Sequence, residues 1–179
     1  GLFHRDARHG HFRIGTYDCY QAMWAIVDVV NPDTPRVTGK IDVGYPGEQL
    51  YATRFDGDRA YVVTYRETDP LWVVDLADPY RPTIVGELHL PGWSDFIYPM
   101  GDKLVAVGRG DRGMGIGVTL FDVANPKAPR VLTQLTLGDW SSQSEANVDH
   151  RAVTILRGAH EPMVLVPYSV LRTQYDSYE

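Results

Sequence analysis

The stretch at 71–90, LWVVDLADPYRPTIVGELHL, decides how the whole chain is interpreted. An apolar run at 71–74 leads to Asp75, and the tight segment DPYRP follows at 78–82. Proline fixes φ near −65° and cannot extend a strand, while an aspartate side chain can bond its own backbone two residues on. Beyond the prolines, apolar residues and glycine alternate along 84–90. The stretch therefore predicts two antiparallel strands joined by a rigid turn.

The same pattern occurs twice more, as WAIVDVVNPDTPRVTGKIDV at 24–43 and as VTLFDVANPKAPRVLTQLTL at 118–137. The aspartates stand 47 residues apart, and an Asn-Pro or Asp-Pro pair follows each of them. A period of about 40 to 50 residues that holds several short strands is typical of propeller blades. The structural repeat residues are Asp28, Asp75, Asp122, Pro32, Pro79 and Pro126.

The fold class predicted is all-β, a partial β-propeller of about four four-stranded antiparallel blades with a 47-residue repeat. We expect residues 1–11 to be an N-terminal extension or frayed segment, and residues 12–179 to be an incomplete propeller. Six to eight blades of this period would need about 280 to 380 residues. Either the remaining blades of a larger propeller lie outside this chain, or another chain completes the ring.

Finer predictions concern the blade edges and the last blade. On the first outer strand Val37, Gly39, Ile41 and Val43 are expected to face inward. In the last blade we expect strands at 144–148, 151–156 and 163–168. Asp149-His150 would form the hairpin turn between the first two strands, in place of a catalytic pair, because the earlier blades have the equivalent turns Asp58-Arg59 and Asp102-Lys103.

Net charge, apolar runs and cysteine count exclude several classes of protein. The net charge of −6 predicts no nucleic-acid partner, since such proteins usually carry a basic stripe. No apolar run reaches the roughly 18 residues of a transmembrane helix, and we expect no signal peptide within this chain. The single cysteine, Cys19, cannot form an internal disulfide.

Several short motifs suggest chemistry but have simpler explanations. The histidines at 4, 9 and 11 are interpreted as part of a terminal segment, although imidazole suits several metals. Gly108, Gly110 and Gly113 match a dinucleotide-binding pattern, but that site needs a helix next, and a strand is predicted at 118–121. The tripeptide at 109–111, Arg-Gly-Asp, is too short to define an adhesion site.

One face of the predicted propeller collects aromatic and charged residues, because the loops between blades and the loops joining second to third strands emerge on the same side. Aromatic residues beside charges are typical of recognition surfaces, although a tryptophan wedged between blades would give the same pattern. The binding-face candidates are Tyr45, Glu48, Trp93, Trp140, Arg109 and Arg112, with 66–69 and His160-Glu161 beside them.

From Tyr51 to Ser169 the chain resembles the secreted beta-propeller domain family of bacterial and archaeal surface proteins, distantly similar to WD40 repeats. The resemblance rests on DRAYVVTYRETDPLWVVDLADPYRPTIVGELHLPGWSDFIYPM at 58–100, VTLFDVANPKAPRV at 118–131, WSSQSEANVDHRAV at 140–153 and VLVPYS at 164–169. The VVDLADPYRPTIVGEL units are also similar to LVIVD-type repeats of cell-surface proteins. The resemblance implies a larger parent domain and a secreted, periplasmic or cell-surface location, and it brings no catalytic residues.

We therefore expect a non-catalytic interaction or scaffold module that recognises a protein or other surface partner through loops on one face. The alternative is a metal-dependent hydrolase with a site in the central channel. Calcium would be its cofactor, because calcium prefers several oxygen ligands. The carboxylates available for it are Glu48, Asp95, Glu145 and Asp149.

Overall fold

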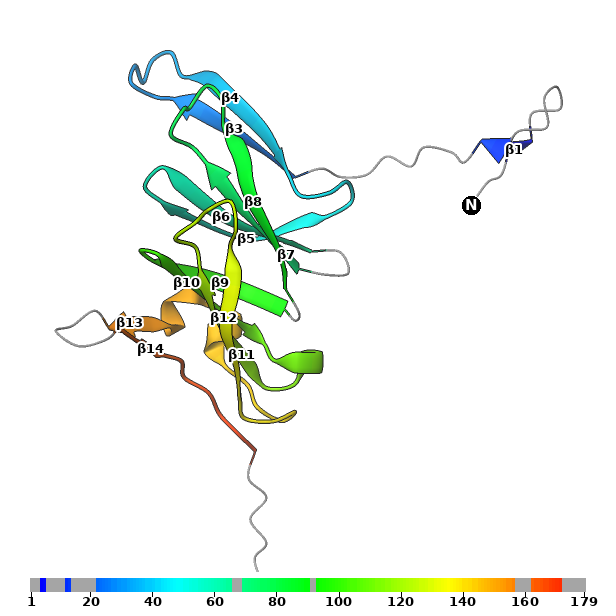
Figure 1. The fold of residues 1–179 in the computed structure, drawn as a ribbon, viewed down its shortest axis with the longest axis vertical. Helices are drawn as coiled ribbons and strands as arrows, with labels where there is room; N and C mark the ends of the chain where they lie inside the picture. Colours follow the sequence, from blue (N-terminus) through cyan, green and yellow to red (C-terminus); the bar gives the residue numbers. More distant parts are fainter. Residues whose placement is uncertain are drawn as a thin grey trace, which may run out of the picture.

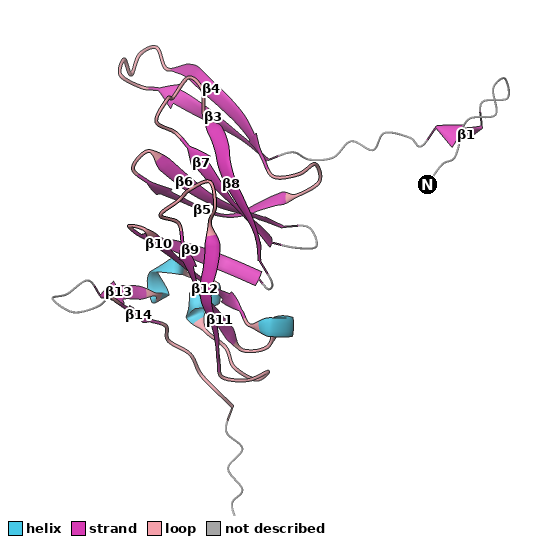
Figure 2. Ribbon diagram, in the orientation of Figure 1, coloured by secondary structure: helices cyan, strands magenta, loops and turns pink. Residues whose placement is uncertain are grey.

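Antiparallel β-strands make up nearly all of the regular structure, which confirms the predicted all-β class. The computed structural model describes residues 4–5, 12–13, 22–65, 69–90, 93–156 and 162–171. The sheets follow one another along the long axis of the molecule (Figure 1). Within the described ranges, the helical segments are 3₁₀ turns of three residues each (Figure 2), and none of them has the length and apolar character needed to cross a membrane.

Two complete four-stranded blades form the centre. The second repeat unit contains β5 (Gln49–Asp56), β6 (Arg59–Tyr65), β7 (Asp69–Asp75) and β8 (Thr83–Leu90). The third contains β9 (Trp93–Met100), β10 (Lys103–Arg109), β11 (Ile116–Asp122) and β12 (Arg130–Leu137). In each blade neighbours in sequence are neighbours in the sheet, and the sheets do not close into a ring.

Two-stranded sheets flank the complete blades. The first repeat unit shows β3 (Ala22–Asp28) paired with β4 (Arg36–Val43), and the last unit shows β13 (Thr154–Leu156) paired with β14 (Met163–Leu165). A further pair joins β1 (His4–Arg5) to β2 (Phe12–Arg13). The predicted boundary between residues 1–11 and 12–179 lies largely outside the described residues.

The Asx-Pro turn has the same hydrogen bonds in every copy. Oδ1 of Asp28, Asp75 and Asp122 accepts from the amide two residues on, at 2.9, 2.9 and 3.1 Å. The Asn or Asp that precedes the proline does the same at 3.1, 2.9 and 3.1 Å. Arg36 and Arg130 each donate two further bonds to the aspartate of their own copy, where the second copy has Thr83. These bonds fix the turn locally.

The outer strands share a β-bulge that corrects one prediction. The register of β4 against β3 shifts so that Thr38 is the extra residue, and its hydroxyl donates to the Ile26 carbonyl at 3.2 Å. The shift recurs 47 and 94 residues later, between β7 and β8 and between β11 and β12. A bulge moves the residues before it to the other face. Val37 is therefore 53% exposed instead of facing inward, whereas Gly39 and Val43 are buried as predicted.

Adjacent blades contact through a glycine and a turn. A Cβ atom on Gly39 in β4 would overlap with the carbonyl oxygen of Pro79, and one on Gly86 in β8 would overlap with that of Pro126. The outer strand of each blade thus accepts the Asx-Pro turn of the next. The equivalent position in β12 is Thr133, and residues 172–173, where the next Asx-Pro pair would fall, are Arg-Thr. Among the described residues, the glycine-to-turn contact therefore joins the first unit to the second and the second to the third.

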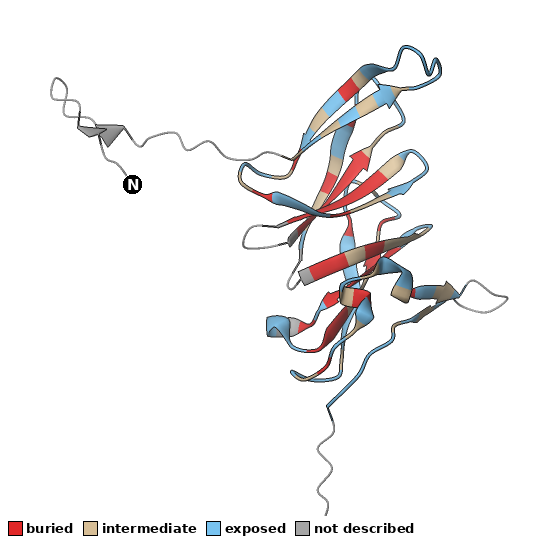
Figure 3. Cartoon of the chain, turned by 180° about the vertical axis from the view of Figure 1, so that it is seen from behind, coloured by how far each residue is buried: buried red, intermediate tan, exposed pale blue. Residues whose placement is uncertain are grey.

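The core lies between blades (Figure 3), and the middle strands are buried on both faces as predicted. In β6, Tyr61 and Val63 pack toward the third blade, while Ala60 and Val62 pack toward the first. In β3, by contrast, Met23 is 56% and Val27 is 46% exposed, because among the described residues nothing covers that face. Each blade is thus stabilised by the next one rather than by itself.

The last unit departs from the predicted strands. Residues at 145–147 and 150–152 form the 3₁₀ turns η2 (Glu145–Asn147) and η3 (His150–Ala152), so the predicted strand at 144–148 and hairpin at Asp149-His150 are wrong. The cause is local capping: Ser144 Oγ accepts from the Ala146 amide at 3.0 Å, and Asp149 Oδ1 accepts from the Arg151 amide at 2.9 Å. Such side-chain bonds compete with strand pairing. Of the strands predicted at 151–156 and 163–168, only 154–156 and 163–165 form.

Candidate functional site

The turns at 45–48 and 139–142 are equivalent, 94 residues apart, and share one geometry. In each, the fourth amide donates to the first carbonyl at 3.0 Å. The fourth side chain accepts in return from the first amide, at 2.9 Å for Glu48 Oε2 and 2.8 Å for Ser142 Oγ. Glu48 is 7% exposed and also accepts from the Thr64 hydroxyl at 2.6 Å. Glu48 and Ser142 thus brace their turns from inside the protein.

Each turn follows a glycine with positive φ, Gly44 at 86° and Gly138 at 73°. This left-handed conformation favours glycine, and a Cβ on Gly138 would overlap with the Ser142 hydroxyl. The turn is therefore set by its own sequence.

Trp140 occupies the second position of its turn, where the earlier turn has Pro46. Asp139 Oδ1 accepts from both the amide and the hydroxyl of Ser141, at 2.9 and 2.6 Å. The Ser141 hydroxyl, followed by its amide, lowers the pKa of Asp139. The braced turn leaves the Trp140 side chain 78% exposed. A large aromatic side chain held on a rigid turn in water is a typical contact residue.

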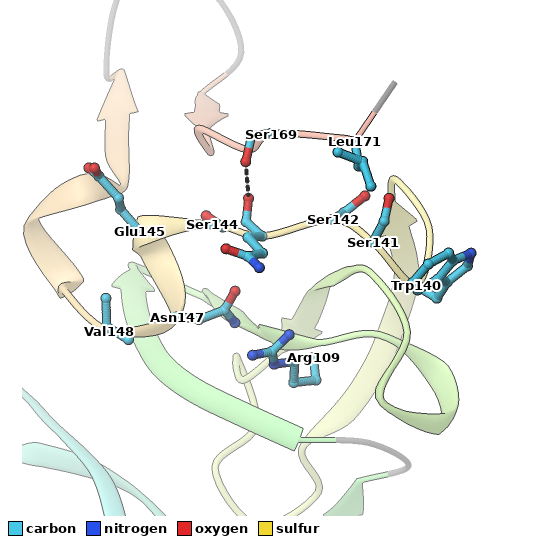
Figure 4. A pocket seen from close by; sticks show the side chains of 11 residues that line it. Arg109, Trp140, Ser141, Ser142, Ser144, Glu145, Asn147, Val148, Ser169 and Leu171 are labelled. Atoms are coloured by element: carbon cyan, nitrogen blue, oxygen red, sulfur yellow. Dashed lines mark hydrogen bonds between the residues drawn. The ribbon is translucent and has the colours of Figure 1, made fainter. Parts of the chain in front are cut away.

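A cavity of about 790 Å³ opens beside this turn (Figure 4). Its lining comes from the end of β10, the segment at 140–145, η2 and the segment around Ser169. Arg109 and Asn147 face the same hollow from β10 and η2. The lining is rich in hydroxyl and amide groups, so it offers hydrogen bonds. The residues are Arg109, Trp140, Ser141, Ser142, Gln143, Ser144, Glu145, Asn147, Val148, Ser169 and Leu171.

The last unit is closed by hydrogen bonds of its own beside the cavity, and it packs on the third blade through Ala146. Gln143 and Ser169 exchange backbone hydrogen bonds at 3.0 and 2.9 Å, and the Ser144 hydroxyl donates to the Pro167 carbonyl at 2.5 Å. Ala146 is fully buried against the third blade, with Val105 and Val107 of β10 in the same cluster. The cavity wall is therefore anchored to the core.

A chain of polar contacts links three successive units next to the cavity. Asp95 on β9 accepts from the Tyr51 hydroxyl on β5 at 3.1 Å and from the Asn147 amide on η2 at 2.6 Å. Tyr51, Asp95 and Asn147 line a second hollow of about 370 Å³, together with Arg109 and Val148. Because Asp95 is 9% exposed, these bonds form in a low-dielectric setting where each is worth more than in water.

The structure separates the binding-face candidates. Arg109 and Trp140 line the same cavity. Tyr45 lies elsewhere: its ring packs edge-on against Trp72 at 5.2 Å, and its hydroxyl donates to Glu87 at 3.0 Å. The Glu87 bond is the main cause of the raised pKa of Tyr45.

The remaining candidates divide as follows. Glu48 braces its turn, and Arg112 lies on η1 (Asp111–Gly113) with φ of 55°. The side chain of Trp93, and residues Arg66, Glu67, His160 and Glu161, lie outside the described part of the chain. The glycine-rich loop between β10 and β11, at 110–115, leads into the strand that the sequence predicted rather than into a phosphate-binding helix.

The carboxylates considered for calcium are engaged in different contacts. Glu48 and Asp95 accept the bonds given above, and Asp149 pairs with Arg151 at 3.0 Å. The Arg151 guanidinium, followed by its amide, lowers the pKa of Asp149. Among the described residues no three histidine, cysteine, aspartate or glutamate side chains are grouped as a metal site.

Sequence reasoning missed Asn147 and Ser144 as residues of the cavity, and it did not connect Tyr51 with Asp95. The available signal was the pair Ser144 and Asp149, each placed to cap a short turn. Interpreted as caps, these two residues would have replaced the predicted strand with short turns and placed Asn147 on the first of them.

Comparisons with known proteins agree with this architecture. The family model described as "Beta propeller domain" matches residues 3–179, so the chain belongs to the beta propeller domain family. An uncharacterized protein of Methanocaldococcus jannaschii is 36% identical over 145 residues, covering 78% of this chain and 23% of that protein. An uncharacterized protein of Archaeoglobus fulgidus is 34% identical over 146 residues, covering 81% of this chain and 23% of that protein. The chain thus spans about a quarter of the length of these relatives.

Proposed function

We propose that this chain is a protein-binding module of a larger propeller and that it meets its partner at the cavity beside Trp140. One observation carries the proposal: two departures from the repeat line the same cavity. These departures are Arg109, at the start of the glycine-rich loop, and the segment at 143–147, which stands where the earlier units have an inner strand. In repeat architectures shared positions maintain the fold, and variable loops carry binding.

The larger ring is part of the same proposal. The bare face of β3, with Met23 and Val27 exposed, has the apolar character of a blade interface. The relatives are about four times as long as the matched segment, which leaves room for additional blades. We propose that further blades, from the same protein or another chain, cover this face.

A differential capture experiment tests the binding site. The tagged chain and its Trp140→Ala variant are exposed to extract of the source organism, and the retained proteins are quantified by mass spectrometry. The control is Tyr80→Ala, which removes another exposed aromatic ring from an Asx-Pro turn away from the cavity. A partner retained by the wild type and by Tyr80→Ala, and lost from Trp140→Ala, supports the proposal. Equal retention of that partner by the wild type and both variants contradicts the proposed binding site.

We also propose a secreted, periplasmic or cell-surface location. Support comes from the similarity of the VVDLADPYRPTIVGEL units to LVIVD-type repeats of surface proteins. Protease treatment of intact cells tests this location, because an exposed protein is digested while a cytoplasmic marker survives. If this protein is protected from protease as fully as the marker, surface exposure is contradicted. If it is released together with the cytoplasmic fraction, export is excluded.

A further inference from the structure

We propose that the cavity beside Trp140 recognises a carboxylate on an extended protein segment, with Arg109 as the residue that binds it. The inference rests on the proposed function and specifies its ligand. The first observation is the position of Arg109. This residue is the last of β10, and its exposed side chain lines the cavity.

The Arg109 guanidinium has no hydrogen-bond or ion-pair partner within the described ranges. Three other arginines form ion pairs within the chain, Arg36 with Asp28, Arg130 with Asp122 and Arg151 with Asp149, at 2.7 to 3.1 Å. Arginine presents its donors in a rigid fork that matches a carboxylate with two parallel bonds. An unpaired fork in a cavity is therefore suited to an external carboxylate.

The acidic groups that share a hollow with Arg109 do not take this role. Both Asp95 oxygens already accept hydrogen bonds, from Tyr51 and Asn147. Glu145 points away from Arg109 in Figure 4. Arg109 is thus the cation of the cavity lining, and apart from Glu145 the polar groups of the lining are neutral hydroxyls and amides.

The shape of the site favours a protein segment over a small molecule. Small ligands are usually enclosed, with most of their surface buried. Here Arg109, Trp140, Val148 and Leu171 are all exposed, so the cavity is open. The three apolar side chains line the same cavity as Arg109, where residues beside an acidic side chain of a bound segment would contact them.

Selection from a phage-displayed random heptapeptide library tests the inference. Peptides selected on the wild-type chain should be enriched in Asp or Glu at one position. The strongest peptide is then titrated, with fluorescence detection, against the wild type, Arg109→Gln, Arg109→Lys and Arg112→Gln. We expect Arg109→Gln to weaken binding about tenfold or more, the usual effect of losing a charge-assisted pair. Arg109→Lys, which keeps the charge without the fork, should weaken binding less.

Arg112→Gln is the matched control, since it removes the same charge from the adjacent loop without touching the cavity lining. A comparable loss in Arg112→Gln would show that general charge attraction explains the affinity, and would overturn the inference. Selected peptides that lack an acidic residue and whose binding depends on Trp140 would refute carboxylate recognition while leaving the proposed binding site intact. A library that yields no peptide above background would refute both.

Discussion

Substituting Gly86 with alanine should weaken the contact between the second and third blades and lower the free energy of unfolding. The new Cβ would overlap with the Pro126 carbonyl oxygen and lie 3.1 Å from Pro129 Cδ. Neither atom can move alone, because the Asx-Pro turn that holds them is fixed by hydrogen bonds of Asn125. Overpacking of this kind costs about 1 to 3 kcal/mol, and replacing glycine returns about 0.4 to 1 kcal/mol through the unfolded chain. Because the Cβ meets a backbone atom, the overpacking cost should lie in the upper part of its range. We therefore expect the free energy of unfolding to fall by about 2 kcal/mol.

The loss is measured by urea unfolding followed through tryptophan fluorescence, and by the melting temperature, which should fall about 4 to 8 °C. Thr133→Ala is the matched control, because position 133 is equivalent to Gly86 but its side chain is exposed on β12. It should change stability by no more than about 0.5 kcal/mol. Wild-type stability of Gly86→Ala, or an equal loss in Thr133→Ala, would refute the role of glycine as the contact point between blades.

Three further predictions concern single contacts. Thr83→Arg should supply Asp75 with the partner that the flanking copies have, and should raise stability in urea unfolding by about 0.2 to 1 kcal/mol, the range of exposed ion pairs; a decrease would contradict this. Thr64→Val should lower stability by about 1 to 3 kcal/mol, because the Thr64 hydroxyl accepts from the buried Trp72 indole at 2.8 Å and donates to the buried Glu48 carboxylate. Urea unfolding followed by tryptophan fluorescence measures this, and an unchanged free energy of unfolding would contradict it. Asp122 has a pKa lowered chiefly by Arg130, so its stabilising effect is complete above the unfolded value near 3.9 and is lost as pH falls through the lower folded value. Asp122→Asn should therefore flatten the acid limb of the stability profile below about pH 4, and an unchanged limb would count against the pairing.

The blades could be predicted because their signals are local and repeated. An aspartate, a second Asx residue and two prolines define each turn within a few positions, and a fixed spacing repeats it. Burial of both faces of β6 followed from its continuous apolar run. The bulge at Thr38 could not be predicted this way, since it depends on which amides pair across the strands and leaves no trace in hydrophobic alternation.

The cavity was harder to predict because its parts come from distant positions. Arg109 and Trp140 were predicted as binding-face candidates because their loops were expected on one side of the propeller, but their placement in one cavity depends on how η2 packs on β10. Asn147 gave no signal as long as 144–148 was interpreted as a strand. Glu48 shows the opposite difficulty: a charged residue in a loop suggests binding, and only the bond from the Tyr45 amide shows that it braces a turn.

Glycine at 39 and 86 and threonine at 133 make growth of this array directional. A second copy of the second unit, inserted before the third, would pack its Asx-Pro turn against Gly86 of the preceding unit, and its own glycine would accept the Asx-Pro turn of the third unit, so unequal recombination there would be tolerated. The same insertion behind the third copy would press a carbonyl oxygen against a threonine side chain, and a second mutation would have to accompany it.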